Sequence, residues 1–323
     1  MNILVTGGLG LIGHHVVDRL EKLGHLVSVV DNKTNYGIIP QDEIDYLMGE
    51  RLKKVYRQGI YIYNDDISDA KKVNHIFNVE QPDIVIHMAS FPRQKVVNAN
   101  PAMGSRVMSE ALLNLLEASK NYDVRKFIYI SSSMVYGDFK DDVKEDAICN
   151  PQGQYGIMKL AGEWLVKDYT RRDNLVHTII RPSAVYGPLD VEDRVISKFL
   201  LTAMRGGTLK VNGASETLDF TYVEDAADGI VAAALSNNTD NKTYNITKSH
   251  SRSLLDAANI AVKIVGKGNI ECKDRDLDFP SRGALNIDAA RKDFGFAPKI
   301  DVEEGFERYY DWFKNSSYWQ SKL

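Results

Sequence analysis

The chain has 323 residues, of which 44% are hydrophobic and 26% charged, and its formal net charge at pH 7 is −4. This composition supports a folded protein of about two domains and disfavours a disordered chain. The acidic balance, without any lysine- or arginine-rich tract, gives no reason to expect nucleic acid or a membrane surface as a partner.

Metal sites, disulfides and membrane segments are not expected either. Cys149 and Cys272 are isolated in the sequence. His14 and His15 are adjacent, and adjacent helical positions point about 100° apart. No apolar run is long enough to cross a bilayer, and the first predicted strand begins at residue 2, which leaves no room for a signal peptide. A cytoplasmic enzyme or binding protein is therefore expected.

The first predicted elements are a strand, a glycine-rich turn and an amphipathic helix. Residues 2–6 are an apolar run of strand-forming residues, and residues 7–13 read GGLGLIG. Apolar residues follow helical spacing from Leu11 onward, and a second strand is predicted at 26–31. Together these elements make one β-α-β unit of about thirty residues.

The spacing of the glycines predicts a dinucleotide cradle. Gly7 allows the tight turn, Gly10 lets the backbone approach a pyrophosphate, and Gly13 lets the helix pack closely on the strand. The N–H groups at the helix start then face the phosphates, where the helix dipole favours negative charge. Asp31, which ends the second strand, is placed to bind the adenosine ribose and favours NAD over NADP. A flexible turn without a ligand is the simpler alternative, and the ordered set of elements argues against it.

Strand-like and helix-like segments continue to alternate. The strands are predicted at 60–63, 83–87, 126–131 and 176–181, and the helices at 69–79, 101–119 and 155–172. This alternation predicts an α/β fold of the Rossmann type, with a doubly wound parallel sheet covered by helices on both faces.

Two regions depart from a plain alternation. Segment 33–57 is longer than an ordinary connection; its part 42–56 is predicted to be helical, and its role stays open. After Pro182 the predicted elements are shorter and are separated by glycine and asparagine pairs. We expect a smaller C-terminal α/β part there, which covers the substrate and returns a segment near 215–245 to the main sheet.

Two later stretches carry residues suited to proton transfer. The sequence SSSMVYG at 131–137 ends a predicted strand, and Tyr155 and Lys159 open a predicted helix four residues apart, on one face. Because parallel sheets bind ligands at the carboxyl ends of their strands, Ser132 is expected on the same rim as the glycine turn. A nearby ammonium and the positive charge of an oxidised nicotinamide favour the phenolate and lower the pKa of the phenol, so Tyr155 could take a proton from a substrate hydroxyl while Ser132 holds the reacting oxygen. A surface tyrosine–lysine pair without function is the alternative.

Several motifs occur in a definite order along the chain. They are the glycine turn at 6–13, HMAS at 87–90, SSSMVYG at 131–137, YxxxK at 155–159, RPSAVYGP at 181–188 and DFTYVED at 219–225. In this order they resemble the extended short-chain dehydrogenase/reductase superfamily, in its nucleotide-sugar epimerase/dehydratase branch. The resemblance implies an NAD-binding Rossmann domain over residues 1–180, a nucleotide-sugar-binding domain over 181–323, and a homodimer in which apolar faces of two helices contribute to a four-helix seam.

The resemblance also implies roles for individual residues. The catalytic triad falls on Ser132, Tyr155 and Lys159. The expected contacts with NAD are Gly7, Gly10, Leu11, Ile12, Gly13, Asp31, Asn32, Asp66, Ile67, Met88, Ala89, Ser90, Tyr155 and Lys159. The expected contacts with a nucleotide-diphosphate sugar are Ser132, Ser133, Met134 and Arg282.

Departures from the family pattern narrow the reaction. Related 4,6-dehydratases carry a glutamate two residues after the catalytic serine or threonine, whereas this chain has Met134, which cannot transfer a proton at neutral pH. Dehydration is therefore disfavoured. What remains is oxidation of a sugar hydroxyl, expected at C4. A 4-epimerase then returns the hydride to the other face of the keto sugar, and a 4-dehydrogenase releases the keto sugar.

The nucleotide and the sugar stay open. Ala184 and Leu218 stand where many relatives have an asparagine and an arginine that contact the diphosphate, and Met108 stands where another asparagine recurs. Arg282 matches a family arginine that pairs with the diphosphate. A GDP-sugar, such as GDP-mannose or a heptose, is as compatible as a UDP- or dTDP-hexose. A non-nucleotide ketone reductase is disfavoured by Arg282 and Asp31, and a non-catalytic NAD sensor is disfavoured by the intact triad.

Overall fold

The computed structural model describes residues 1–34, 37, 39–56, 60–91 and 94–323. Within these ranges, seven strands form one parallel sheet in the order β11-β6-β5-β4-β1-β2-β3. The strands are β1 (Asn2–Thr6), β2 (Leu26–Val30), β3 (Tyr61–Tyr63), β4 (Ile84–His87), β5 (Lys126–Ile130), β6 (His177–Pro182) and β11 (Lys242–Ile246). The strand order reverses direction between β1 and β4, and ligands of such sheets bind at this reversal. The predicted Rossmann-type sheet is confirmed.

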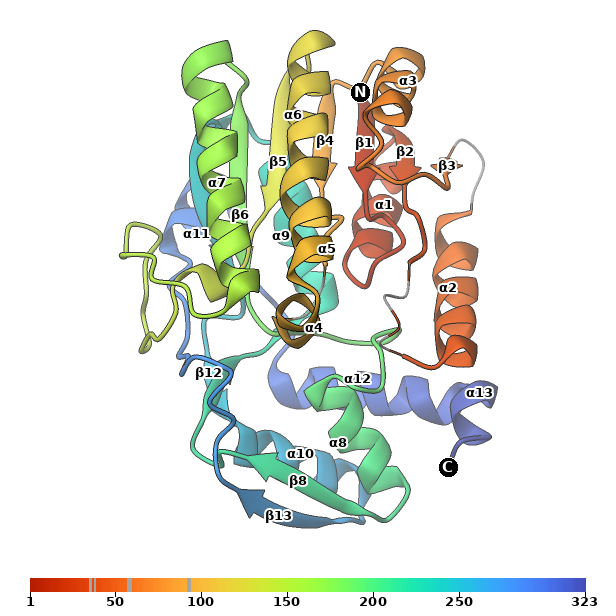
Figure 1. The fold of residues 1–323 in the computed structure, drawn as a ribbon. Coiled ribbons are helices and arrows are strands. Elements are labelled where there is room, and N and C mark those ends of the chain that lie inside the picture. The colour runs from red at the N-terminus through yellow and green to blue at the C-terminus, as the bar shows by residue number, and fades with distance from the viewer. Residues whose placement is uncertain (35–36, 38, 57–59, 92–93) are drawn as a thin grey trace.

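Helices cover both faces of the sheet (Figure 1). One face packs on α1 (Gly13–Lys22), α9 (Val223–Leu235) and α11 (Asp288–Phe294). The other packs on α3 (Ala70–Glu80), α6 (Ala111–Asn121) and α7 (Gln154–Asp173). Because both faces are covered, strand residues that point to either face are buried, as β5 shows with five buried residues in a row.

The predicted helix over 101–119 is interrupted. It consists of α5 (Pro101–Ser105), a π-helical turn over Arg106–Glu110, and α6, and it follows α4 (Gln94–Ala99). At this turn the N–H of Ala111 bonds to the carbonyl of Arg106, five residues back. One extra residue in a turn barely changes the spacing of the apolar residues along the helix, so the π-helical turn could not be recognised from the sequence pattern.

The smaller part of the molecule lies below the carboxyl ends of the strands (Figure 1). It contains α8 (Val195–Met204), β8 (Thr208–Asn212), β9 (Thr217–Asp219), β12 (Ser251–Ser253), α10 (Leu254–Val265), β13 (Asn269–Lys273), α12 (Val302–Asn315) and α13 (Ser317–Gln320). These elements share an apolar core of their own, rich in aromatic side chains from the two last helices. Two short paired strands, β7 (Val185–Tyr186) and β10 (Thr221–Tyr222), join this part to the main sheet. Within the described ranges, no helix has both the length and the apolarity needed to span a membrane.

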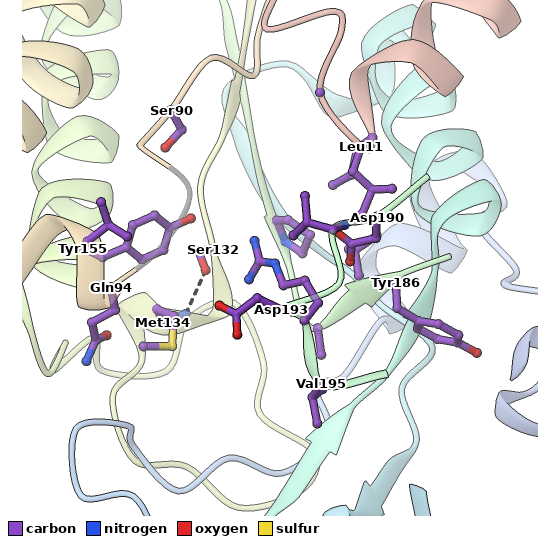
Figure 2. A pocket seen from close by; sticks show the side chains of 18 of the residues that line it. Leu11, Ser90, Gln94, Ser132, Met134, Tyr155, Tyr186, Asp190, Asp193 and Val195 are labelled. Carbon is purple, nitrogen blue, oxygen red and sulfur yellow. Dashed lines mark hydrogen bonds between the residues drawn. The ribbon is translucent and has the colours of Figure 1, made fainter. Parts of the chain in front are cut away.

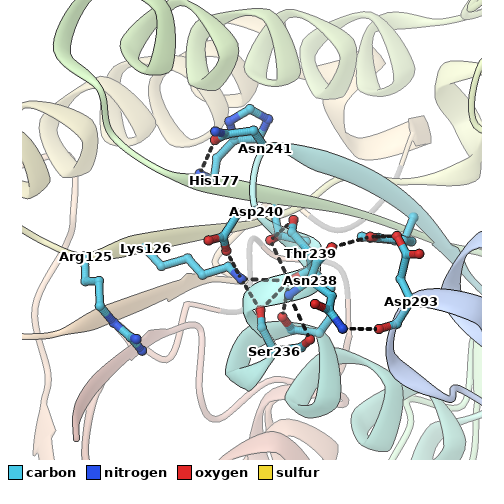
Figure 3. Close-up of polar contacts among 12 residues, drawn as sticks. Arg125, Lys126, His177, Ser236, Asn238, Thr239, Asp240, Asn241 and Asp293 are labelled. Carbon is cyan, nitrogen blue, oxygen red and sulfur yellow. Dashed lines mark hydrogen bonds and ion pairs between the residues drawn. The ribbon is translucent and has the colours of Figure 1, made fainter.

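The segment that returns to the main sheet is fastened at its turn by a buried lysine. Lys126, at the start of β5, is 3% exposed. Its Nζ donates to the carbonyl of Ser236 at 2.6 Å and to Oγ1 of Thr239 at 2.7 Å, and it pairs with Asp240 at 2.7 Å (Figure 3). These three residues connect α9 to β11, so the bonds fix the edge strand at the end of the sheet opposite the carboxyl ends.

Candidate active site

A cavity of about 1310 Å³ lies between the carboxyl ends of the main sheet and the smaller part. Every residue predicted for the cofactor, the substrate or catalysis lines it. They are Gly7, Gly10, Leu11, Ile12, Gly13, Asp31, Asn32, Asp66, Ile67, Met88, Ala89, Ser90, Ser132, Ser133, Met134, Tyr155, Lys159 and Arg282. Residues from seven separate stretches of the chain thus meet in one place.

The glycine turn between β1 and α1 needs its glycines for space. Gly7 has a φ of +69°, and a Cβ there would lie 2.6 Å from the amide nitrogen of Ala89. A Cβ on Gly13 would overlap the carbonyl oxygen of Gly7, so α1 could not start so close to β1. At Gly10 a Cβ would meet only that same oxygen, at 3.1 Å, which leaves its cavity side open. This shape fits a pyrophosphate laid against the backbone.

Asp31 follows β2 and faces the same end of the cavity. Its Oδ2 accepts from the N–H of Leu9 and its Oδ1 from the N–H of Lys33, both at 2.9 Å. Burial raises the pKa of this carboxyl, and the two backbone N–H groups oppose that rise. Each oxygen keeps a lone pair for a ribose hydroxyl.

The three predicted catalytic residues come from β5 and α7. Ser132 is the second residue after the end of β5, and its Oγ accepts from the N–H of Met134 at 3.2 Å. Tyr155 stands at the start of α7, and Figure 2 shows its hydroxyl pointing towards Ser132, with Ser90 nearby. Lys159 lies one turn further on; its Nζ donates to the carbonyl of Ile130 at 2.7 Å and is 5.9 Å from the centre of the Tyr155 ring.

The electrostatics around Tyr155 differ from the simple expectation. We expected the Lys159 ammonium and the charge of the oxidised nicotinamide together to lower the pKa of the phenol; with the protein's own groups alone, burial raises it above its ordinary value. The charge of Arg194 and the hydroxyls of Ser132 and Ser90 act against burial. Burial also lowers the pKa of Lys159 to about 7, so this amine exchanges its proton near neutral pH. The phenolate therefore needs more positive charge than the bare site provides.

Behind Lys159 lies a buried ion pair that the sequence analysis missed. Glu163 is fully buried and pairs with Arg181, which is 3% exposed, through Nε at 2.9 Å and Nη2 at 2.7 Å. Glu163 also accepts from Oγ of Ser131, the neighbour of Ser132, at 2.6 Å. Its charge raises the pKa of Lys159 against the effect of burial. Glu163 therefore ties α7 to the end of β5 through Ser131, and it also raises the pKa of Lys159 on the same helix.

Of the residues predicted to contact the substrate, Arg282 has an N–H group without a hydrogen-bond partner among the described residues, whereas the hydroxyl of Ser133 is already bonded. Nη1 of Arg282 lies 3.5 Å from Sδ of Met134, and its Nε has no hydrogen-bond partner among the described residues. Burial lowers the pKa of this guanidinium to about 10, which still leaves it charged at neutral pH. Ser133 instead donates its hydroxyl to Ser183 at 3.1 Å and is 1% exposed, so it forms wall and offers no free hydroxyl.

Comparison with known proteins identifies the family. The sequence pattern of the NAD dependent epimerase/dehydratase family matches residues 3–247. The chain is a member of this family. The UDP-glucuronic acid 4-epimerase of Bacillus cereus, solved in complex with UDP-glucuronic acid and NAD, is 28% identical, with a TM-score of 0.90 over 97% of this chain and 99% of that chain. The UDP-glucose 4-epimerase of Thermotoga maritima, solved with UDP-glucose, is 28% identical, with a TM-score of 0.87 and the same coverage. The dTDP-D-glucose 4,6-dehydratase of Mus musculus is 28% identical over 99% of this chain and 90% of the relative.

Membership of the NAD dependent epimerase/dehydratase family makes NAD the cofactor. The glycine turn, Asp31 and the open end of the cavity fit that molecule. The charged residues that line or adjoin the cavity and were missed by the sequence analysis include Arg51, Glu163, Asp190 and Arg194. Glu163 stands four residues after Lys159 and could have been found from the helical stripe, whereas Arg51 and Arg194 lie in no motif.

Asp31 gives a direct test of how this family member selects its cofactor. Asp31→Asn keeps an acceptor for a backbone N–H but removes the charge that repels a 2′-phosphate. The ratio of NADPH to NADH affinity is expected to rise about tenfold, which is about 1.4 kcal/mol. Fluorescence titration with both reduced dinucleotides measures it, and Asp18→Asn on α1 is the control. An unchanged ratio would remove Asp31 from the ribose site.

Proposed function

We propose that this protein is an NAD-dependent nucleotide-sugar 4-epimerase that works through a 4-keto intermediate. The observation that carries the proposal is the convergence of Ser132, Tyr155 and Lys159 on a cavity that also contains the glycine turn and Arg282. Relatives that are 4-epimerases of UDP-glucuronic acid and UDP-glucose, with nearly full coverage, support it.

In this proposal the chain's own residues handle the proton. Tyr155 accepts the proton of the C4 hydroxyl and later returns one to the C4 oxygen. Ser132 donates a hydrogen bond to that oxygen and holds it in line. Lys159 stabilises the phenolate by its charge. When bound, NAD would supply the acceptor for the hydride that leaves the sugar C4 and the donor for its return to the other face.

Met134 supports epimerisation over elimination. Loss of water from C5 and C6 requires a proton donor and acceptor beside the hexose, and a thioether is neither at neutral pH. Met134 is 6% exposed and lies against Arg282, so at this position the wall presents a thioether in place of a carboxylate. The mouse dehydratase is therefore similar in sequence to this chain, but its reaction is not the one proposed here.

The two parts of the molecule receive separate roles in the proposal. Residues 1–180, together with the returning segment near 215–245, hold NAD. Residues 181–323 hold the nucleotide-sugar, with Arg282 as a cation for the diphosphate. Arg194, which precedes α8, is a second cation in the cavity wall, whereas Leu218 is apolar where relatives have an arginine.

A homodimer is also part of the proposal. Leu112, Leu116 and Tyr169 are buried in the core, but Trp164 on α7 is 64% exposed and Leu113 on α6 is 38% exposed. Large apolar side chains on two neighbouring helices suit a four-helix seam between two copies.

Product analysis tests the reaction. The protein is incubated with UDP-, GDP-, dTDP- and CDP-sugars. Formation of NADH is followed by its absorbance, and the sugar products are identified by NMR. We expect an epimerised sugar without net NADH, with a UDP-sugar as the first candidate. Lasting NADH accumulation means a 4-dehydrogenase in place of an epimerase, and no change with any sugar refutes the proposal.

A further inference from the structure

Segment 33–57 has no part in the reaction proposed above, yet its helix lies at one end of the cavity. This helix is α2 (Gln41–Val55), and the side chains of Ile44, Met48 and Arg51 line the cavity. Arg51 is 5% exposed, which is unusual for a guanidinium.

Arg51 connects the two sides of the site. Its Nη1 donates to the carbonyl of Leu9 in the glycine turn at 3.0 Å. Its Nη2 donates to the carbonyl of Leu189, in the loop after β7, at 2.6 Å. Its Nε has no hydrogen-bond partner among the described residues. A buried N–H of a charged group is costly to leave unpaired, so this group, in the wall of the cavity, points to a ligand.

The charges around Arg51 indicate what kind of ligand it is. Asp31 and Asp190 both line the cavity and both act on the guanidinium, opposing the effect of burial on its pKa. Figure 2 shows Asp190 close to Leu11, whose N–H belongs to the turn that fits a pyrophosphate. Two carboxylates beside a pyrophosphate repel it, and a buried guanidinium between them offsets that repulsion.

We propose that Arg51 is a binding residue for the pyrophosphate of NAD, with its Nε–H directed to a phosphate oxygen. Its two Nη groups stay on Leu9 and Leu189, so the same side chain holds the glycine turn against the loop of the smaller part. Helix α2 thereby acquires a role in cofactor binding. The proposal rests on NAD as the cofactor and is independent of the sugar.

The test compares ligands that do and do not carry the pyrophosphate. Binding of ADP-ribose and of adenosine to the full chain, freed of dinucleotide, is measured by calorimetry and by displacement of NADH. Arg51→Met is expected to weaken ADP-ribose binding about 10- to 100-fold, and adenosine binding less than about threefold. Arg51→Lys, which keeps the charge, is expected to fall between wild type and Arg51→Met.

Lys53→Met is the matched control, since Lys53 lies on the same helix and its side chain is 74% exposed. It is expected to change neither affinity. Equal weakening of both ligands by Arg51→Met, or no weakening of ADP-ribose, overturns the proposal. If circular dichroism shows that Arg51→Met does not fold, the affinities of Arg51→Lys for ADP-ribose and adenosine are compared with those of the wild type in its place. Weaker binding of ADP-ribose alone supports the proposal, and any other result overturns it. Failure of every sugar to react leaves these affinities untouched, so the two proposals fail separately.

Discussion

Tyr155→Phe is expected to lower kcat at least about 10³-fold while the protein still binds NAD. The substitution removes only the hydroxyl that points towards Ser132, so the ring keeps its place among Val97, Met108 and their neighbours. Among the described residues beside this hydroxyl, Ser132 is a poor base and Lys159 is held on the carbonyl of Ile130 at 2.7 Å, so neither replaces the phenol in the proposed reaction. Turnover is measured on the sugar identified by the product analysis, and NADH binding by fluorescence.

Tyr169→Phe is the matched control for this experiment. It makes the same change on the same helix, but the Tyr169 hydroxyl bonds to Glu117 on α6, away from the cavity. It is expected to keep the kcat of the wild type. If Tyr155→Phe retains more than about a tenth of the wild-type kcat, the phenol is not the base and another proton acceptor must be sought.

The sequence predicted the cavity well because its motifs sit where backbone geometry permits little choice. Gly7 needs a positive φ, and Gly13 must let α1 start beside β1. Tyr155 and Lys159 share a face of one helix, and Ser132 follows a strand whose carboxyl end faces the same rim. Local rules therefore suffice to bring these residues together.

The features of the site that the sequence did not predict depend on contacts between distant segments. The spacing of residues along the chain does not encode such contacts. Arg51 reaches Leu189, 138 residues away, and nothing in segment 33–57 shows that this side chain is buried. The pKa of Tyr155 depends on Arg194, in the smaller part of the molecule, and on burial by the whole fold. The raised pKa of the phenol among the protein's own groups was not foreseen for the same reason: burial is a tertiary property.

Glu163→Gln is expected to destabilise the fold by about 3–5 kcal/mol, the usual cost of leaving one partner of a buried ion pair unmatched. Its partner Arg181 is only 3% exposed, so water cannot solvate the guanidinium once the carboxylate charge is lost. The glutamine can still accept from Ser131, so the change isolates the charge. Urea unfolding at pH 7 measures the difference. Glu117→Gln, at an exposed carboxylate, is the control and is expected to cost less than about 1 kcal/mol.

The same variant also tests whether Glu163 acts on the reaction. Glu163 raises the pKa of Lys159, which burial brings down to about 7. Without that negative charge Lys159 loses its proton at lower pH, so the limb of the kcat/KM profile that reports Lys159 moves to lower pH. At pH 7 more of Lys159 is then neutral, and the phenolate loses its cation. Glu163→Asp, which keeps the charge, is expected to restore the position of the profile. A profile that drops in height without moving along the pH axis would mean that Glu163 only holds β5 and α7 together.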